Sequence, residues 1–265
     1  MNIIICGYGK MGRLIEKFAN EYKWNILAVI EPTSDYKAKT LYGTPFYQSV
    51  ESIAIDQSNS IITNCNIVAI DFTHPSCVLD NIAAFAKKKI PLVVGTTGWH
   101  DKLIDVKETV TNANSSLLWS SNFSLGVNIF YKIAALACAL FNKYSEYDVA
   151  GFEIHHNQKA DSPSGTAKEI EDIVLKNFTR KKKVIDEKLD RKPQTDELHF
   201  ASMRCGSVPG THSLLFDSTA DSIEIKHTTR NREGLVMGAL AAAKWLSEKT
   251  KSGESGIWTM EDVLK

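Results

Sequence analysis

The feature that most constrains the fold is the glycine pattern GYGKMG, at residues 7–12, taken with its flanking segments. The preceding run NIIIC is short, apolar and rich in branched residues, which is typical of a strand buried on both faces of a parallel sheet. After the glycines, RLIEKFANEY places apolar side chains at helical spacing, and NILAVI predicts a second strand. The order strand, glycine turn, helix, strand is that of a nucleotide-binding βαβ unit.

Each glycine of this turn has its own physical reason. Gly7 permits the tight turn, Gly9 removes a side chain that would block a pyrophosphate, and Gly12 lets helix and strand pack closely. The free amides and positive dipole end of the helix then face the phosphates. The sequence therefore predicts a dinucleotide site, and a plain glycine turn is the alternative.

The acid that follows the second strand bears on the choice of dinucleotide. Glu31 lies where a carboxylate accepts hydrogen bonds from ribose hydroxyls, although an ordinary acidic strand end is the alternative. A carboxylate would repel a 2′-phosphate, and Pro32 brings no cation, so we expect NADH to be preferred over NADPH. Lys10 and Lys37 could still reach a phosphate, which keeps NADPH possible.

Three further segments continue the alternation. NIVAIDFT predicts a buried strand, VLDNIAAFAKKK an amphipathic helix, and PLVVGTTG a strand that ends in a turn. This order predicts an α/β fold with a doubly wound, Rossmann-like parallel sheet. Ligands bind at the carboxyl ends of such strands, so Gly95 and Thr97 are candidates for the nicotinamide side. Capping of the next helix is the alternative for the threonine.

The pattern changes near Asn122. The segment IFYKIAALACALF predicts a packed helix that is too short to span a membrane, and mixed strand-like and helical runs follow it. We therefore expect a dinucleotide-binding domain made of residues 1–125 and 235–265, with the last helix packing back onto it. Residues 126–234 form a second, α+β domain in this interpretation.

Composition narrows the range of partners. Basic and acidic residues are equal at 31 each, so nothing calls for nucleic acid or an anionic membrane, and a small molecule is the default partner.

The five cysteines show no C-x-x-C pairing, so we expect no disulfide framework and no metal site. Without a leader or a long apolar run, we expect a soluble, cytoplasmic protein. The run RKKK at 180–183 is interpreted as a solvated loop.

The stretch EIHHNQKADSPSGTA, at residues 153–167, is the strongest candidate for a substrate site. His155 or His156 can hold or release a proton near neutral pH, and Lys159 adds a positive charge. Such a loop suits an anionic substrate that is protonated during the reaction. A hydrogen-bonded structural histidine is the alternative.

The same stretch ends at the start of a predicted helix. Ser164, Gly165 and Thr166 therefore lie at a helix N-terminus, where amides, a hydroxyl and the helix dipole converge on a site for a carboxylate.

With these residues in place, a family resemblance is clear. The motifs GYGKMGR, DFTHP, GTTG, SNFSLGVN and EIHHNQKADSPSGTA resemble the dihydrodipicolinate (4-hydroxy-tetrahydrodipicolinate) reductase family over nearly the whole chain. The last motif is specific to that family, whereas many dinucleotide enzymes share the first. The resemblance implies NAD(P)H-dependent reduction of 4-hydroxy-tetrahydrodipicolinate to tetrahydrodipicolinate, in the diaminopimelate route to lysine. It also implies a homotetramer built through the second domain, which would bind substrate and mediate oligomerisation.

The resemblance also implies roles for particular residues. His155 and Lys159 match the proton-donating pair; we expect His155 to be the donor and Lys159 to hold a carboxylate, although the sequence does not decide between them. The substrate-binding positions match His156, Lys159, Ser164, Gly165 and Thr166. The cofactor contacts match Gly7, Lys10, Met11, Glu31, Gly95, Thr97 and Phe123.

Two departures from the family pattern concern the cofactor. Many members carry an extra glycine in the first loop and an arginine after the ribose-binding acid, and this chain has neither. Recognition of a 2′-phosphate is therefore the property placed in question.

Two other functions remain as alternatives. Another two-domain NAD(P)-dependent amino-acid dehydrogenase would need a different loop after the strand GFEI. A non-catalytic NADH-sensing module would have no need for a histidine, a lysine and a carboxylate-binding turn in one loop.

Overall fold

The structure is a computed structural model, and it describes residues 1–32, 40, 42–53 and 67–265, so that Lys37 lies outside the described residues. The chain divides into two compact units. The first consists of Met1–Ser124 and Glu233–Lys265, and the second of Leu125–Arg232.

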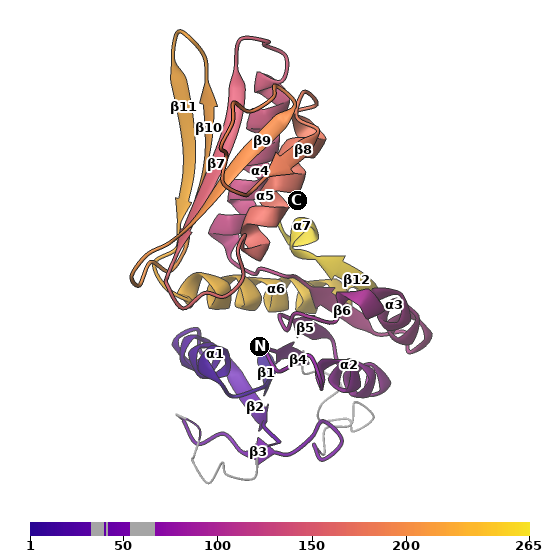
Figure 1. The fold of residues 1–265 in the computed structure, drawn as a ribbon. Coiled ribbons are helices and arrows are strands. Elements are labelled where there is room, and N and C mark those ends of the chain that lie inside the picture. The colour runs from indigo at the N-terminus through magenta and orange to yellow at the C-terminus, as the bar shows by residue number, and fades with distance from the viewer. Residues whose placement is uncertain (33–39, 41, 54–66) are drawn as a thin grey trace. The chain divides into compact units, whose positions relative to one another are not determined.

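The first unit is built on a parallel sheet of seven strands (Figure 1). Its strand order is β12-β6-β5-β4-β1-β2-β3, and every neighbouring pair is parallel. The strands are β1 (Asn2–Cys6), β2 (Asn25–Ile30), β3 (Phe46–Tyr47), β4 (Ile67–Asp71), β5 (Leu92–Val94), β6 (Ser116–Trp119) and β12 (Gly256–Thr259). The order reverses at β1, so the predicted Rossmann-like sheet is confirmed, with its ligand crevice expected between the loops after β1 and β4.

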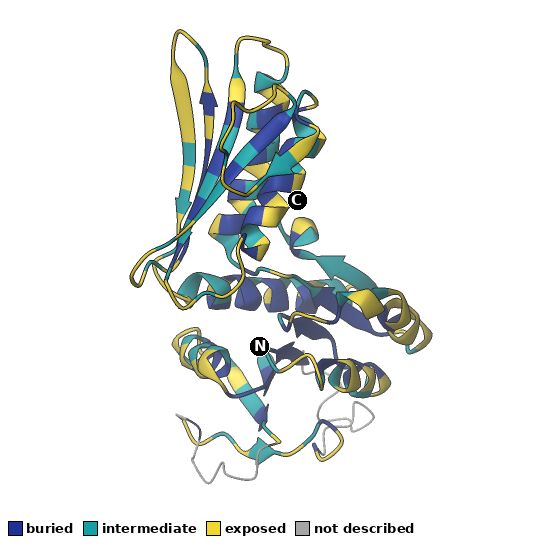
Figure 2. Cartoon of the chain, viewed as in Figure 1, coloured by how far each residue is buried: buried dark blue, intermediate teal, exposed yellow. Residues whose placement is uncertain are grey.

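Helices α1 and α6 contact each other, as do α2 and α3, and both pairs pack on this sheet. The helical segments of the unit are α1 (Lys10–Glu21), α2 (Val78–Lys87), η1 (His100–Lys102), α3 (Leu103–Asn112), α6 (Glu233–Lys251) and α7 (Met260–Val263). Helix α6 contacts β4, β5 and β6, so it packs on the first unit as expected for the helix in residues 235–265. Strand β4 is buried at every position because both of its faces are covered (Figure 2).

The second unit contains a mixed sheet of order β11-β10-β7-β9-β8 with helices α4 (Leu125–Phe141) and α5 (Gly165–Asn177). The strands are β7 (Asp148–His155), β8 (Lys183–Ile185), β9 (Glu197–Arg204), β10 (Thr211–Asp217) and β11 (Ser222–Thr228). Strand β10 runs antiparallel to β11 and β7, whereas β9 is parallel to β7 and β8. This mixture confirms the predicted α+β character.

Strand β7 carries the candidate site on its core face. Its residues alternate between buried and partly exposed, so that Val149, Gly151, Glu153 and His155 share the buried face (Figure 2). The ionisable side chains of Glu153 and His155 therefore follow two apolar positions on the buried face. Both need hydrogen-bonding or charged partners, because burying an unpaired polar group costs free energy.

The interpretation of RKKK as a solvated loop is only partly right, since Lys182 and Lys183 are exposed but Lys181 is not. Lys181 is buried, and its Nζ lies 2.6 Å from Asp148 Oδ1. Arg180 donates hydrogen bonds to the backbone carbonyls of Ser145 and Tyr147, and Lys183 begins β8. A run of cations predicts exposure only when no carboxylate or carbonyl lies within reach, and these partners are distant in sequence.

In the part of the chain that the structure describes, no helix combines the length and the apolar character needed to cross a membrane.

Candidate active site

The glycine loop after β1 has the geometry of a phosphate cradle. Gly7 adopts a φ of +87°, and a Cβ on Gly12 would stand 2.1 Å from the carbonyl oxygen of Gly7. A Cβ on Gly9 would meet nothing within 4 Å, so the space in front of this residue is open. Helix α1 begins directly after Gly9 with no side-chain cap at its N-terminus. Open space before an uncapped helix start fits a pyrophosphate.

The acid after β2 is tied to this loop. The amide of Tyr8 donates a hydrogen bond of 2.9 Å to Glu31 Oε2. The Tyr8 side chain is buried, with its hydroxyl on the carboxylate of Glu16 and the Arg13 guanidinium 4.8 Å from its ring centre. The sequence analysis missed Tyr8 and Glu16, although an acid on the apolar face of the predicted helix was the available signal. The hydrogen bond from Tyr8 therefore holds the carboxylate of Glu31 against the glycine loop.

Asp71, at the end of β4, joins the loops after β4 and β5. Its buried carboxylate accepts hydrogen bonds from the Thr73 hydroxyl at 2.8 Å, the Thr96 hydroxyl at 2.6 Å and the Asn81 side-chain amide at 2.8 Å. The buried side chain of Thr96 therefore joins the loop after β5 to the end of β4, whereas Thr97, the next residue, is exposed. Sequence reasoning selected Thr97 and missed Asp71, which the motif DFTHP displays at the end of a buried strand.

Two other predicted cofactor contacts lie close to Phe72. A Cβ on Gly95 would stand 2.2 Å from the Phe72 ring, so a side chain there would displace this ring. The buried ring of Phe123 packs 6.0 Å from the Phe72 ring, centre to centre. Of the two contacts predicted in the first turn of α1, Lys10 is exposed and Met11 partly buried.

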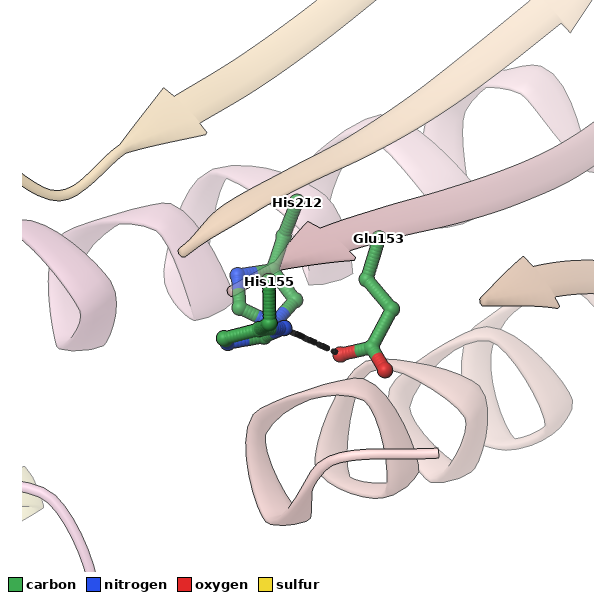
Figure 3. A group of neighbouring side chains, drawn as sticks. All are labelled: Glu153, His155 and His212. Atoms are coloured by element: carbon green, nitrogen blue, oxygen red, sulfur yellow. Dashed lines mark ion pairs between the residues drawn. The ribbon is translucent and has the colours of Figure 1, made fainter. Parts of the chain in front are cut away.

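The centre of the second unit's site is the fully buried carboxylate of Glu153, which the sequence analysis did not select (Figure 3). Its Oε1 accepts hydrogen bonds from the Ser164 amide at 3.0 Å, the Ser202 hydroxyl at 3.0 Å and Arg204 Nη2 at 3.1 Å. Its Oε2 lies 3.2 Å from His155 Nδ1 and 3.3 Å from His212 Nε2. One oxygen thus anchors the protein framework, and the other faces two imidazoles.

These contacts set the charges of the cluster. Burial raises the pKa of Glu153, but the close approach of His212 and the hydrogen bonds from Ser164 and Ser202 outweigh it and hold the pKa well below its usual range. Burial lowers the pKa of His155 to about 4; Glu153 opposes this shift, and the charges of His212, Lys159 and Arg204 add to it. At neutral pH, Glu153 is therefore ionised and His155 neutral.

The rest of the predicted substrate loop surrounds the start of α5. Ser164 is the N-cap: its Oγ accepts a hydrogen bond of 3.1 Å from the Ala167 amide and lies 3.1 Å from His212 Nε2. A Cβ on Gly165 would meet nothing within 4 Å, so this helix start opens onto free space. Lys159 Nζ lies 2.8 Å from Asp161 Oδ1.

Two predicted substrate-binding residues complete the loop. The carbonyl of His156 accepts a hydrogen bond of 3.1 Å from the Lys159 amide. Thr166 lies in the first turn of α5, after Gly165. The structure therefore gathers the predicted substrate residues at the end of β7 and the start of α5.

The same cluster raises the question of a metal ion. Glu153, His155 and His212 offer donor atoms within 4.8 Å of one another, the one such group among the described residues. Two histidines and a glutamate can bind zinc. However, the Arg204 guanidinium already contacts this carboxylate, and a second cation there would be repelled. The arrangement fits acid–base chemistry better than a metal.

A nucleotide-type sheet with a glycine cradle in one unit, and a buried acid–base cluster beside a helix N-terminus in the other, define a class of protein. The class is that of the two-domain NAD(P)-dependent oxidoreductases.

Comparisons with known proteins identify the family. The family model described as "Dihydrodipicolinate reductase, N-terminus" matches residues 1–123, and "Dihydrodipicolinate reductase, C-terminus" matches residues 126–264. The 4-hydroxy-tetrahydrodipicolinate reductase of Christiangramia forsetii is 36% identical over 265 residues, covering 100% of this chain and 98% of the relative. That of Wolbachia pipientis wMel is 34% identical over 270 residues, covering 100% of both chains.

Among solved structures, the dipicolinate-bound dihydrodipicolinate reductase of Paenisporosarcina sp. TG-14 has the same fold. It superposes with a TM-score of 0.74 at 21% identity, covering 98% of this chain and 97% of that one. The chain belongs to the dihydrodipicolinate reductase family. It is an NAD(P)H-dependent oxidoreductase of the diaminopimelate route to lysine. The expected family is thereby confirmed, in place of another dehydrogenase or a sensor.

Proposed function

We propose that this chain reduces 4-hydroxy-tetrahydrodipicolinate to tetrahydrodipicolinate, with His155 as the proton donor and Lys159 holding a substrate carboxylate. The observation that carries the assignment is that Glu153 contacts both His155 and the amide of Ser164, at the start of α5. The acid–base group and the anion site are thus fixed to one buried side chain.

The two compounds define the atom balance of the reaction. Hydrogen replaces the hydroxyl at ring C4, so each turnover uses one hydride and one proton, and the hydroxyl leaves as water. When bound, the dinucleotide supplies the hydride. The chain's own residues must then hold a dicarboxylate, exclude bulk water and provide the proton.

His155 becomes the proton donor when the substrate binds. Without substrate the imidazole is neutral at neutral pH, because its pKa is lowered to about 4. A dianionic substrate beside the ring would raise this pKa, since an opposite charge favours the protonated form. His155 would therefore take up a proton from solution as the substrate arrives and deliver it to the bound substrate.

Lys159 and the start of α5 are assigned to binding the two carboxylates of the substrate. Lys159 Nζ pairs with Asp161 in the described structure, and a substrate carboxylate would replace this exposed partner. The open space beside Gly165, at the positive end of the α5 dipole, suits the second carboxylate. We assign Ser164, Thr166 and His156, which lie in the same loop and helix start, to the binding set as well.

The first unit is assigned to the dinucleotide, with NADH preferred over NADPH. Gly7, Gly9 and Gly12 shape the pyrophosphate cradle, and Glu31 faces the ribose. The residues with predicted supporting contacts are Lys10, Met11, Gly95, Thr97 and Phe123. The support for NADH is the Glu31 carboxylate, which is fastened to the Tyr8 amide and would repel a 2′-phosphate.

The second unit is assigned to the substrate and to assembly of a homotetramer. Exposed apolar side chains on the sheet face opposite the buried residues of β7 support the second role: Met203 on β9 and Leu215 on β10. Such side chains on one face of the sheet suit contact with another copy of it. Membership of a biosynthetic family supports a cytoplasmic location.

A coupled assay tests the function. Dihydrodipicolinate synthase, pyruvate and aspartate semialdehyde generate the substrate, and oxidation of NADH and NADPH is followed in parallel. We expect rapid oxidation that requires the synthase and is faster with NADH. Absence of oxidation with either nucleotide, from protein shown to bind NADH, would overturn the proposed substrate.

A further inference from the structure

We propose that Glu153 is a positioning residue that fixes the His155 imidazole relative to the N-terminus of α5. His212 contacts both Glu153 and the N-cap of this helix. The proposal rests on the proposed role of His155 as proton donor. Glu153 is not expected to touch the substrate, because its side chain is fully buried.

The two oxygens of Glu153 perform different tasks. Oε1 accepts hydrogen bonds from the Ser164 amide, the Ser202 hydroxyl and Arg204, which fix the carboxylate to α5 and β9. Oε2 lies within 3.3 Å of a ring nitrogen of both His155 and His212. Oε2 accepts no hydrogen bond from either ring, so the fixed carboxylate acts on the two imidazoles through its charge.

His212 closes the arrangement from β10. It pairs with Glu153 across the antiparallel β7–β10 register, and its Nε2 lies 3.1 Å from Ser164 Oγ. The N-cap of α5, the carboxylate and the His155 ring are thus connected through buried side chains. A shift of any one of them would displace the proton donor relative to the anion site.

His155 is confined from the opposite side as well. A Cβ on Gly210 would stand 2.9 Å from His155 Nε2, so the ring occupies space that only a glycine leaves. The carbonyl of His155 accepts a hydrogen bond of 2.8 Å from the Cys205 amide, which fixes the backbone at the end of β7. The imidazole therefore lies between a carboxylate at Nδ1 and a bare backbone near Nε2.

The charge of Glu153 has a separate effect on the proton. The groups that face His155 are Glu153 on β7, Arg204 on β9, His212 on β10 and Lys159 in the loop after β7. Of these four, only Glu153 favours the protonated imidazole. Replacing this carboxylate with a neutral amide leaves His155 among groups that disfavour its protonation.

The test uses Glu153→Gln in the full chain and reads the titration of His155 directly. Histidine labelled with carbon-13 gives one imidazole signal per residue, and His155→Gln identifies the signal of His155. We expect the titration midpoint of His155 to fall by about one pH unit or more in Glu153→Gln. Ser202→Ala removes a hydrogen bond to Glu153 Oε1 and leaves the charge of this carboxylate in place. The titration midpoint of His155 should therefore stay at the wild-type value in Ser202→Ala.

Steady-state kinetics supply the second measurement. In Glu153→Gln the basic limb of the kcat/KM profile should move to lower pH, and kcat should fall more than KM changes. Wild-type kcat in folded Glu153→Gln would overturn the positioning role, and an unchanged His155 titration would overturn the effect of the Glu153 charge on the proton. Inactivity of the wild-type protein toward the coupled substrate would instead overturn the proposed function, so the two failures are distinguishable.

Gly210→Ala keeps the proposal open to refutation if Glu153→Gln does not fold. The added methyl meets the ring from the Nε2 side and leaves every charge in place, and the φ of +155° at Gly210 adds backbone strain that urea unfolding of the variant measures separately. A displaced His155 signal, with a lower kcat and a KM within about twofold of wild type, is the expected result. An unmoved His155 signal with wild-type kcat would overturn the confinement of the ring.

Discussion

The amide of Tyr8, in the glycine loop, donates a hydrogen bond of 2.9 Å to the carboxylate of Glu31, at the end of β2. The phosphate cradle and the proposed ribose acceptor are therefore directly linked. The preference for NADH should depend on the charge of Glu31, because the same carboxylate would face a 2′-phosphate.

Glu31→Gln should lower the ratio of kcat/KM for NADH to that for NADPH by about fivefold, since a repulsion on the order of 1 kcal/mol is removed. The amide oxygen can still accept the Tyr8 hydrogen bond, so the loop should survive. Kinetics with both nucleotides at fixed substrate measure the ratio. Glu108→Gln, an exposed acid on α3, is the matched control, and an unchanged ratio in Glu31→Gln would remove the electrostatic explanation.

Gly9 and Gly12 should respond differently to the same methyl group. Gly12→Ala sets a Cβ against the backbone oxygen of Gly7, and we expect the free energy of unfolding to fall by about 1–3 kcal/mol. Gly9→Ala adds its methyl to open space, so the fold should persist while NADH affinity falls. Denaturant unfolding and NADH fluorescence titration separate the two effects. Wild-type NADH affinity in Gly9→Ala would argue against the cradle.

His155→Gln and Lys159→Ala should each lower turnover by a factor on the order of 10². We expect His155→Gln to act mainly on kcat, and Lys159→Ala to raise the KM for substrate as well because a carboxylate partner is lost. NADH binding should survive in both. Lys168→Ala removes an exposed lysine of α5 and serves as the charge control. Full activity in either variant would exclude its assigned role.

The lowered pKa of His155 predicts a pH-dependent stability. The imidazole titrates at about 4 in the folded protein and at about 6.5 when unfolded, so between these values the unfolded state binds more protons. The free energy of unfolding should therefore fall as the pH drops through this window, with a contribution of about 2 kcal/mol lost by about pH 5. Glu153 loses its contribution only at lower pH, below the usual glutamate pKa.

Urea unfolding at neutral pH and near pH 5, on wild type and His155→Gln, measures this effect. The variant should lose less stability than wild type between the two conditions. An equal loss in both proteins would show that His155 does not titrate in the predicted window.

The first unit was predictable because its signals are local. The spacing of Gly7, Gly9 and Gly12, followed by a helix and an acid, lies within one short segment. The Asp71 network was not predictable to the same degree, since Thr96 and Asn81 reach this carboxylate from different segments. A strand that ends in aspartate shows only that some partner is required.

The site in the second unit shows the same division. His155, Lys159 and Ser164 lie in one motif and were selected together. Ser202 and His212 reach Glu153 by strand register: both lie directly opposite it, on β9 and β10 respectively. Register between strands so far apart in sequence cannot be read from either strand alone. The wrong interpretation of Lys181 has the same origin, since Asp148 lies on β7.

The composition of the first unit from two distant segments has a consequence for synthesis on the ribosome. Strand β12 pairs with β6, and α6 covers β4 to β6, yet both are translated only after the whole of Leu125–Arg232. Until they emerge, β6 is an open sheet edge and the apolar surface that α6 later covers is exposed to water. While the inserted unit is being synthesised, the nascent chain therefore carries an incomplete nucleotide-binding domain whose open edge and exposed apolar surface are prone to aggregation.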